Sequence, residues 1–224
     1  VTLWGAFSGR VEAPQRVELR PRVSGYIDQV AFKEGELVDQ GDVLFTIDPR
    51  PYQAREQLAQ AELARMRSQL TLARSEATRS EQLWERRAIS REEFEQRNAA
   101  RSMAQAAVNA AAAALQSAQL DLEYTQVRAP VSGRIGRAQV TRGNLATADT
   151  TLLATLVSVD PLYVYFESDQ QTVQDNPHGP SVPVRIGLAS GQDFPYEGQL
   201  DFVDNQYNSR TGTLQYRAEV ANPD

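Results

Sequence analysis

The residues that could perform acid–base chemistry are two pairs of carboxylates, Glu92 with Glu93 and Asp201 with Asp204. Such pairs are catalytic when a cleft separates the pKa values of the two groups. The first pair lies where the first turn of a helix is expected, and the helix dipole alone favours acids there. The second pair lies on an expected strand and at its end. Neither pair therefore indicates a catalytic site.

Two other residues could support metal or carrier chemistry. His178 is the only histidine and the chain has no cysteine, so the sequence offers no ligand set at metal-binding spacing. Lys33 is the only lysine beside 22 arginines. A lipoyl or biotinyl carrier needs its lysine at the exposed turn that joins the two similar halves of its β-sandwich. Lys33 lies instead inside the first of two similar β segments of this chain, which are described below. We therefore expect no catalytic residue, no metal and no cofactor, and so a protein that is not an enzyme.

The composition excludes two further classes. The 224 residues carry a formal net charge of −6, whereas a general nucleic-acid binder has a basic footprint. No window of about 18 residues is uninterruptedly apolar, so no transmembrane helix is predicted in this stretch.

Two long helices dominate the centre of the chain. Residues 52–87 contain no Gly or Pro, and a second helix is expected from Ser90, where Glu93 completes a capping-box pattern, to about Asp121. Apolar residues recur at alternating spacings of three and four, which is a coiled-coil seam broken by Ser80. The seam residues are Ala59, Leu63, Met66, Leu70, Ala73, Ala77 and Trp84, then Ala104, Val108, Ala111, Leu115, Ala118 and Leu122. The short join predicts an antiparallel hairpin, roughly 50 Å long.

The flanks of this hairpin repeat each other at a constant offset along the chain. The matching residues are Arg20, Val23, Ser24, Gly25, Ile27, Gly35, Leu37 and Leu44 with Arg128, Val131, Ser132, Gly133, Ile135, Gly143, Leu145 and Leu152. Such self-similarity marks a duplicated structural unit. Each copy is too small to bury a core alone, so the two copies are expected to form one β-sandwich with the hairpin inserted between them.

Residues 159–224 form a separate β region, with strands expected at 162–167, 182–188, 199–203 and 213–220. The opening strand, residues 3–17, has no counterpart in the repeat and is expected to complete a barrel with them. The predicted fold is thus an elongated α+β multi-domain chain. Its parts are a β-barrel domain (1–17 and 159–224), a β-sandwich (18–50 and 122–158) and a helical hairpin (51–121).

This layout resembles the periplasmic adaptor, or membrane fusion, proteins of RND-type tripartite multidrug efflux pumps, of the AcrA/MexA/MexE kind. The resemblance covers essentially the whole chain. It rests on Val17–Asp48 with V-S-G-Y-I and F-K-E-G-x-L-V, on Arg128–Gly136, Val159–Val164 and Thr211–Ala218, and on Asn222-Pro223.

The resemblance implies that the sandwich is a lipoyl-like domain and that the protein links an inner-membrane RND drug/proton antiporter to an outer-membrane channel. It also implies a periplasmic location at the inner membrane of a Gram-negative bacterium, and self-association into a ring, in the family a hexamer. A membrane-proximal domain of the family is expected to be absent from this stretch. Alternative functions are an adaptor of an ABC exporter or a type I secretion system, and a lipoyl or biotinyl carrier, against which the missing turn lysine argues.

The family's tip motif is an Arg, a Leu four residues on and a Ser seven further, which here are Arg79, Leu83 and Ser90. Arg79 and Leu83 share one helix face, so we expect these three residues to contact the outer-membrane channel. The simpler interpretation is an ordinary helix surface with Ser90 as an N-cap. Flexible joints are expected near 16–19, 48–52, 122–126 and 157–161.

Overall fold

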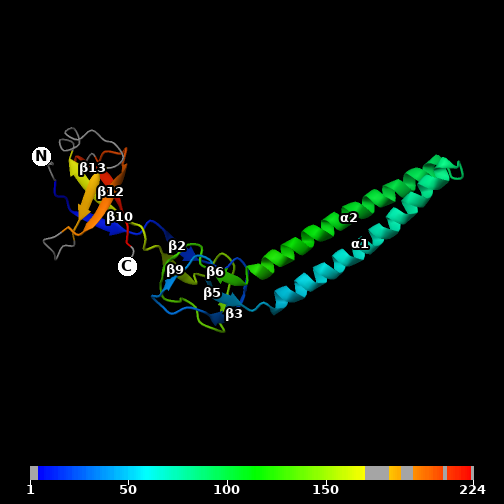
Figure 1. Cartoon of the computed structure of the whole chain (residues 1–224). Coiled ribbons are helices and arrows are strands. Elements are labelled where there is room, and N and C mark those ends of the chain that lie inside the picture. Colours follow the sequence, from blue (N-terminus) through cyan, green and yellow to red (C-terminus); the bar gives the residue numbers. More distant parts are fainter. Residues whose placement is uncertain (1–4, 170–181, 188–193, 209–210, 223–224) are drawn as a thin grey trace.

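The structure is a computed structural model that describes residues 5–169, 182–187, 194–208 and 211–222. The molecule is elongated, with three parts in a row (Figure 1): a five-stranded sheet, a middle pair of four-stranded sheets and a long helical hairpin. The expectations for His178 and Pro223 lie outside the described residues.

The helices and strands follow the predicted order. The helices are α1 (Arg50–Glu85) and α2 (Arg91–Glu123). The strands before them are β1 (Gly9–Glu12), β2 (Arg16–Leu19), β3 (Gly25–Val30), β4 (Leu37–Val38) and β5 (Val43–Ile47). Those after them are β6 (Gln126–Arg128), β7 (Gly133–Ile135), β8 (Leu145–Ala146), β9 (Ala154–Val157), β10 (Leu162–Asp169), β11 (Pro183–Ile186), β12 (Tyr196–Val203) and β13 (Thr213–Val220).

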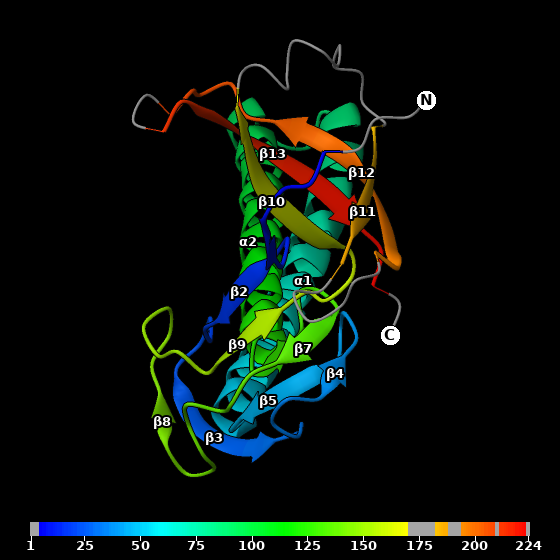
Figure 2. The same cartoon turned by 90° about the vertical axis from the view of Figure 1, so that its left-hand side faces the viewer.

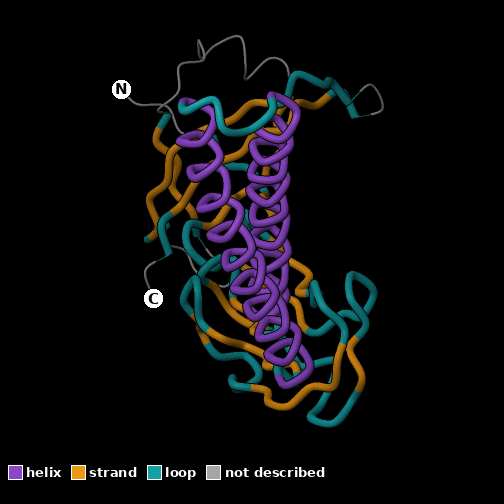
Figure 3. The backbone as a smooth tube through the Cα atoms, turned by 90° about the vertical axis from the view of Figure 1, so that its right-hand side faces the viewer, coloured by secondary structure: helices purple, strands orange, loops and turns teal. Residues whose placement is uncertain are grey.

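The two long helices lie side by side as predicted (Figure 3). Leu63, Leu70 and Ala77 of α1 are buried one heptad apart, and Ala111 of α2 is buried as well. Small side chains in the seam let the helices approach closely, and polar pairs flank it. The Arg97 guanidinium lies 2.8 Å from the Glu76 carboxylate, and Arg74 donates to the side chain of Gln105 at 2.7 Å.

Two seam residues differ in their surroundings from the apolar positions. Ser80 is only 5% exposed, and its hydroxyl donates to the Ala77 carbonyl oxygen at 2.8 Å, so the helix itself satisfies this polar group. Trp84 follows in the same seam but remains 40% exposed, because the helices end within a turn of it. Its ring stacks on Phe94 of α2, with 5.6 Å between the ring centroids.

The middle part consists of two sheets that enclose one core. Their strand orders are β2-β9-β7-β4 and β6-β5-β3-β8, so each sheet takes two strands from each copy of the repeat. All eight strands contribute to a single cluster of buried apolar side chains, whose largest fully buried members include Phe45, Ile27 and Leu156. The hairpin is inserted between β5 and β6, which are neighbours in one sheet.

Backbone hydrogen bonds between the two copies of the repeat come in pairs that join equivalent residues. Gly35 N donates to Ile135 O at 2.9 Å, and Gly143 N donates to Ile27 O at 2.8 Å. A second equivalent pair joins Gly41 N to Ala129 O at 2.9 Å and Asp149 N to Pro21 O at 2.8 Å. The chain therefore folds with an internal two-fold relation that extends to individual backbone contacts.

The five-stranded sheet is curled and has the order β1-β10-β13-β12-β11, with every neighbouring pair antiparallel (Figure 2). β1 joins this sheet, as expected for the opening strand. Arg16 and Val17, which the sequence assigned to the same strand, lie instead in β2 and pair with β9 of the middle part. The chain thus crosses between the two parts at residues 13–15, because the pairing of β2 is decided by a strand in the distant second copy of the repeat rather than by local pattern.

Candidate functional site at the hairpin tip

The turn between the helices is closed at the end of α1 by a Schellman motif. Ala88 N donates to Leu83 O, and Arg87 N donates to Trp84 O, both at 2.8 Å. This geometry requires a left-handed residue just beyond the helix, and Arg87 occupies that position with φ of 58°. Glycine is the usual residue there, since it has no Cβ to clash with the backbone.

Ser90 begins α2 as its N-cap. The Ser90 hydroxyl accepts a hydrogen bond from Glu93 N at 3.2 Å, which satisfies one of the free amides of the first turn. Glu92 and Glu93 lie in that first turn, where the positive end of the helix dipole stabilises carboxylates. The N-cap role predicted for Ser90 is confirmed, and the first carboxylate pair has a structural explanation.

The structure brings the three predicted tip residues to the same end of the hairpin. Arg79 and Leu83 lie on the last two turns of α1 beside the buried seam, and Ser90 lies across the turn from them. Leu83 is 37% exposed, while the Arg79 side chain is exposed and has no ion-pair or hydrogen-bond partner among the described residues. An unpaired guanidinium and an exposed leucine on one face suit contact with another protein. None of the three residues is placed for chemistry.

Two features of the tip were missed by the sequence interpretation. The Trp84–Phe94 stack ties the ends of the two helices together. The turn itself carries Arg86 and Arg87, both exposed and without ion-pair partners among the described residues. The run of arginines at 86, 87 and 91 was a readable signal, since no acidic residue interrupts it.

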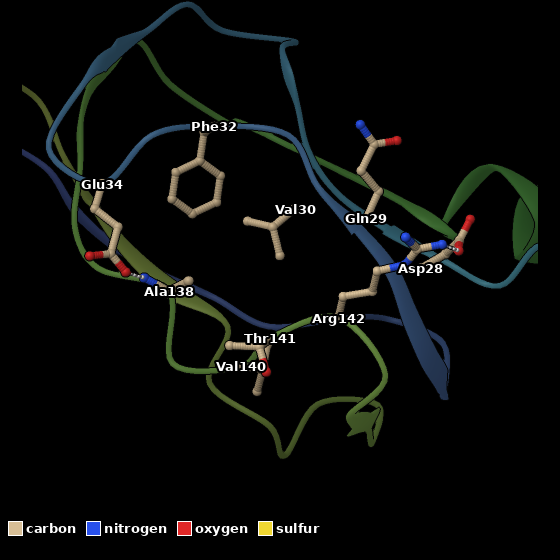
Figure 4. A pocket seen from close by; sticks show the side chains of 9 residues that line it. All are labelled: Asp28, Gln29, Val30, Phe32, Glu34, Ala138, Val140, Thr141 and Arg142. Carbon is tan, nitrogen blue, oxygen red and sulfur yellow. Dashed lines mark hydrogen bonds and ion pairs between the residues drawn. The ribbon is translucent and has the colours of Figure 1, made fainter.

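A surface pocket lies elsewhere, in the middle part, where equivalent segments of the two copies of the repeat meet (Figure 4). It has a volume of about 530 Å³ and lies between residues 28–34 and 136–142, which are equivalent in the repeat. Val30, Phe32 and Val140 form its apolar wall. Its charged side chains satisfy partners within the protein: Arg142 pairs with Asp28 at 3.3 Å, and Glu34 accepts from Ala138 N at 3.1 Å.

The second carboxylate pair, Asp201 with Asp204, makes contacts within the fold. Asp201 accepts a bidentate hydrogen bond from Arg217, with a shortest distance of 2.7 Å, and this contact raises the pKa of Arg217 above its usual value. Asp204 accepts instead from Gln206 N at 3.0 Å, so the second carboxylate pair does not form a common site. Within the described ranges, no three His, Asp or Glu residues lie close enough to hold a metal ion. None of the described helices is long and apolar enough to cross a bilayer.

The chain is similar to proteins whose names refer to multidrug efflux. It is 38% identical over 226 residues to the multidrug export protein AcrE of Escherichia coli (strain K12), a match that covers 96% of this chain and 59% of AcrE. It is 35% identical over 227 residues to the multidrug efflux pump subunit AcrA of the same strain, covering 96% of this chain and 57% of AcrA. The chain thus spans somewhat more than half the length of these curated relatives.

Among solved structures, the chain matches a MacA–MexA chimeric protein that contains the Pseudomonas aeruginosa MexA α-hairpin domain. The TM-score is 0.62 at 25% identity, over 96% of this chain and 73% of the chimera. Two stretches of the chain also match family models. Residues 15–158 match the barrel-sandwich hybrid domain of the RND membrane fusion proteins, and residues 161–224 match their β-barrel domain. Together these matches show that the chain belongs to the RND membrane fusion protein family.

Proposed function

We propose that this protein is a non-enzymatic periplasmic adaptor, associated with the inner membrane, that links an inner-membrane RND drug/proton antiporter to an outer-membrane channel. Several copies would form a ring, in the family a hexamer, and thereby a sealed conduit for multidrug efflux. The observation that carries the proposal is the hairpin tip, where Arg79, Leu83 and Ser90 lie on one exposed end, and where the Arg79 side chain has no hydrogen-bond or ion-pair partner among the described residues. Family membership and the names of the relatives support it.

We further propose that the three parts are domains. The hairpin (51–121) would be the arm that reaches the channel, and the middle sheets (18–50 and 122–158) a lipoyl-like domain. The five-stranded sheet would belong to a β-barrel domain (1–17 and 159–224). The pairing of β2 with β9 supports a slightly earlier boundary, between Glu12 and Arg16.

The function follows from geometry rather than from chemistry. The helix α1 has 36 residues and thus a length of about 54 Å, which makes it a lever that carries the tip far from the sheets. At the tip, Arg79 offers a charged fork that suits carbonyl or carboxylate oxygens, while Leu83 offers apolar contact area.

Crosslinking in intact cells tests this proposal, because the chain has no cysteine of its own. A single cysteine would replace Leu83 or Ser90 in the full-length protein. We expect an adduct with an outer-membrane channel, which is lost when Arg79→Asp is added. The matched control is Arg67→Asp, an exposed arginine three turns away on the same helix, which should leave the adduct intact. An exported, folded protein that gives no channel adduct would contradict the tip assignment.

A further inference from the structure

Arg87 has a backbone conformation that is unusual for its residue type. Two residues other than glycine have positive φ among the described residues, Arg87 at 58° and Asp149 at 57°. Asp149 is readily explained, because aspartate tolerates the left-handed region and its counterpart in the repeat is Gly41, with φ of 96°. Arginine has no such tolerance. A residue that is kept in an unfavourable backbone conformation at an exposed tip points to a task for its side chain.

Stabilisation of the helix does not account for the choice of Arg87. A cation near the C-terminus of α1 interacts favourably with the helix dipole, but Arg86 already provides that charge from the C-cap position, without a positive φ. Glycine or asparagine at 87 would complete the same Schellman motif with less strain. Arg87 therefore strains the backbone without a gain in stability that glycine or asparagine would lack.

The side chains of Arg86 and Arg87 are also free to bind. The nearest carboxylates in sequence, Glu85 and Glu92, form no ion pair with either arginine, and Arg91 is engaged with Glu95 at 2.7 Å. Residues 86–91 contain three arginines and no acidic residue, in a chain whose formal net charge is −6. The turn residues themselves are thus basic, although Glu85 and Glu92 flank them, and they complement an acidic surface.

We propose that Arg86 and Arg87 form a second contact at the hairpin apex, which binds a carboxylate-lined surface of the outer-membrane channel. This proposal rests on the proposed function and adds to it the chemistry of the partner's surface. Arg79 and Leu83 would provide the contact on the side of α1, whereas the two apex arginines would approach the channel end-on. Their guanidinium groups suit paired hydrogen bonds to carboxylates.

The decisive variants are Arg87→Gly and Arg87→Asn in the full-length protein. Both remove the charge and relieve the backbone, so the midpoint of thermal unfolding should stay equal or rise by about 2 °C. Binding to the purified channel that crosslinks at position 83 should weaken about tenfold in Kd. Arg87→Lys keeps the charge but loses the paired hydrogen bonds, so its affinity should lie between that of the unmodified protein and that of Arg87→Asn. The control Arg67→Gln should change neither measurement.

The opposite movement of stability and binding distinguishes a docking role from a structural one. If Arg87→Gly lowers both the unfolding temperature and the affinity, the arginine supports the turn and the proposal fails. If both neutral variants bind the channel normally while Arg79→Asp does not, the proposed function stands and the apex contact is wrong.

The difference in channel affinity between the unmodified protein and Arg87→Asn should narrow at about 0.5 M salt, because exposed charge contacts are screened. Charge-dependent binding to phosphatidylglycerol vesicles instead of the channel would also overturn it.

Discussion

The hairpin and the five-stranded sheet are both attached to the middle part by two chain crossings, yet the two joints are built differently. Tyr52 at the root of α1 belongs to the buried cluster of the middle part, and the half-buried Leu122 and Tyr124 at the root of α2 pack against it. Among the described residues after 158, no side chain belongs to that cluster. Two joints with the same number of chain crossings can therefore differ in how firmly they hold the parts that they connect.

At the hairpin root, Tyr52 is 8% exposed, and its hydroxyl donates to Ser24 O at 2.7 Å. Thr125 is buried in the turn between α2 and β6, where its carbonyl oxygen accepts from Ile47 N at 2.8 Å. The joint therefore combines apolar burial with hydrogen bonds, and bending it would expose core surface to water.

At the joint to the five-stranded sheet, hydrogen bonds connect the two chain crossings. Gln15 N donates to the Ser158 hydroxyl at 3.1 Å, and Ser158 N donates to Gln15 O at 3.0 Å. Nearer to the sheet, Asn222 N donates to the Asp160 carboxylate at 2.9 Å. Ser158 is buried, with 7% of its surface exposed, but the described residues after 158 add no side chain to the apolar core, so bending here would break hydrogen bonds without exposing that core. We therefore expect bending at this joint and much less at the hairpin root, although the sequence alone favoured flexible joints at both.

Tyr52→Ala should have the largest effect, because it removes the aromatic ring that anchors α1 in the core. Replacement of a buried aromatic residue by alanine costs about 3–5 kcal/mol in the free energy of unfolding. Urea denaturation of the purified protein measures this loss. Tyr52→Phe removes only the hydrogen bond to Ser24 and should cost about 1 kcal/mol. A loss below about 1 kcal/mol for Tyr52→Ala would mean that the hairpin is not anchored through the core.

The contrast between the joints could be predicted only in part from sequence. The seams and the Ser90 cap were readable, because helix periodicity and capping depend on residues within a turn or two. The repeat was readable because its two copies retain the same turn residues at the same spacing. The burial of Tyr52 was not, since it depends on core residues from both copies of the repeat, which lie far away in the chain. The crossing at residues 13–15 was missed for the same reason, as β2 finds its partner in β9.

Spin labels can compare the joints directly, because the chain has no native cysteine. One double-cysteine variant, at the exposed positions Arg137 and Arg67, spans the hairpin root. A second, at the exposed positions Arg137 and Glu219, spans the joint to the five-stranded sheet. Electron–electron double resonance should give a narrower distance distribution for the first pair.

Ser158→Ala should then widen the second distribution and leave the first unchanged, since it removes the hydroxyl that accepts from Gln15 N. The cost in unfolding free energy should be about 1 kcal/mol, well below that of Tyr52→Ala. Equal widths in the unmodified protein would show that polar contacts alone can hold a joint as firmly as core packing.

The smallest effect should come from the charge at the start of α1. Asp48 accepts hydrogen bonds from the Arg50 side chain at 2.7 Å and 2.8 Å and from Arg50 N at 3.1 Å, and these contacts lower the pKa of its carboxyl to about 2. A lowered pKa stabilises the fold above the unfolded-state pKa of about 4, and this contribution disappears as the pH falls toward 2. Asp48→Asn should therefore unfold at a slightly lower temperature than the unmodified protein at pH 7, and at the same temperature near pH 2.

Arg50→Gln provides the matched test, because it removes the other half of the same contact. Combining it with Asp48→Asn should add nothing further to the loss at pH 7, as expected for residues that act as one pair. The Arg50 side chain is 84% exposed, so water screens the pair and the change should be much smaller than that of Tyr52→Ala. A loss as large as that of Tyr52→Ala would mean that charge, and not burial, fixes the root of the hairpin, and the contrast between the two joints would lose its physical basis.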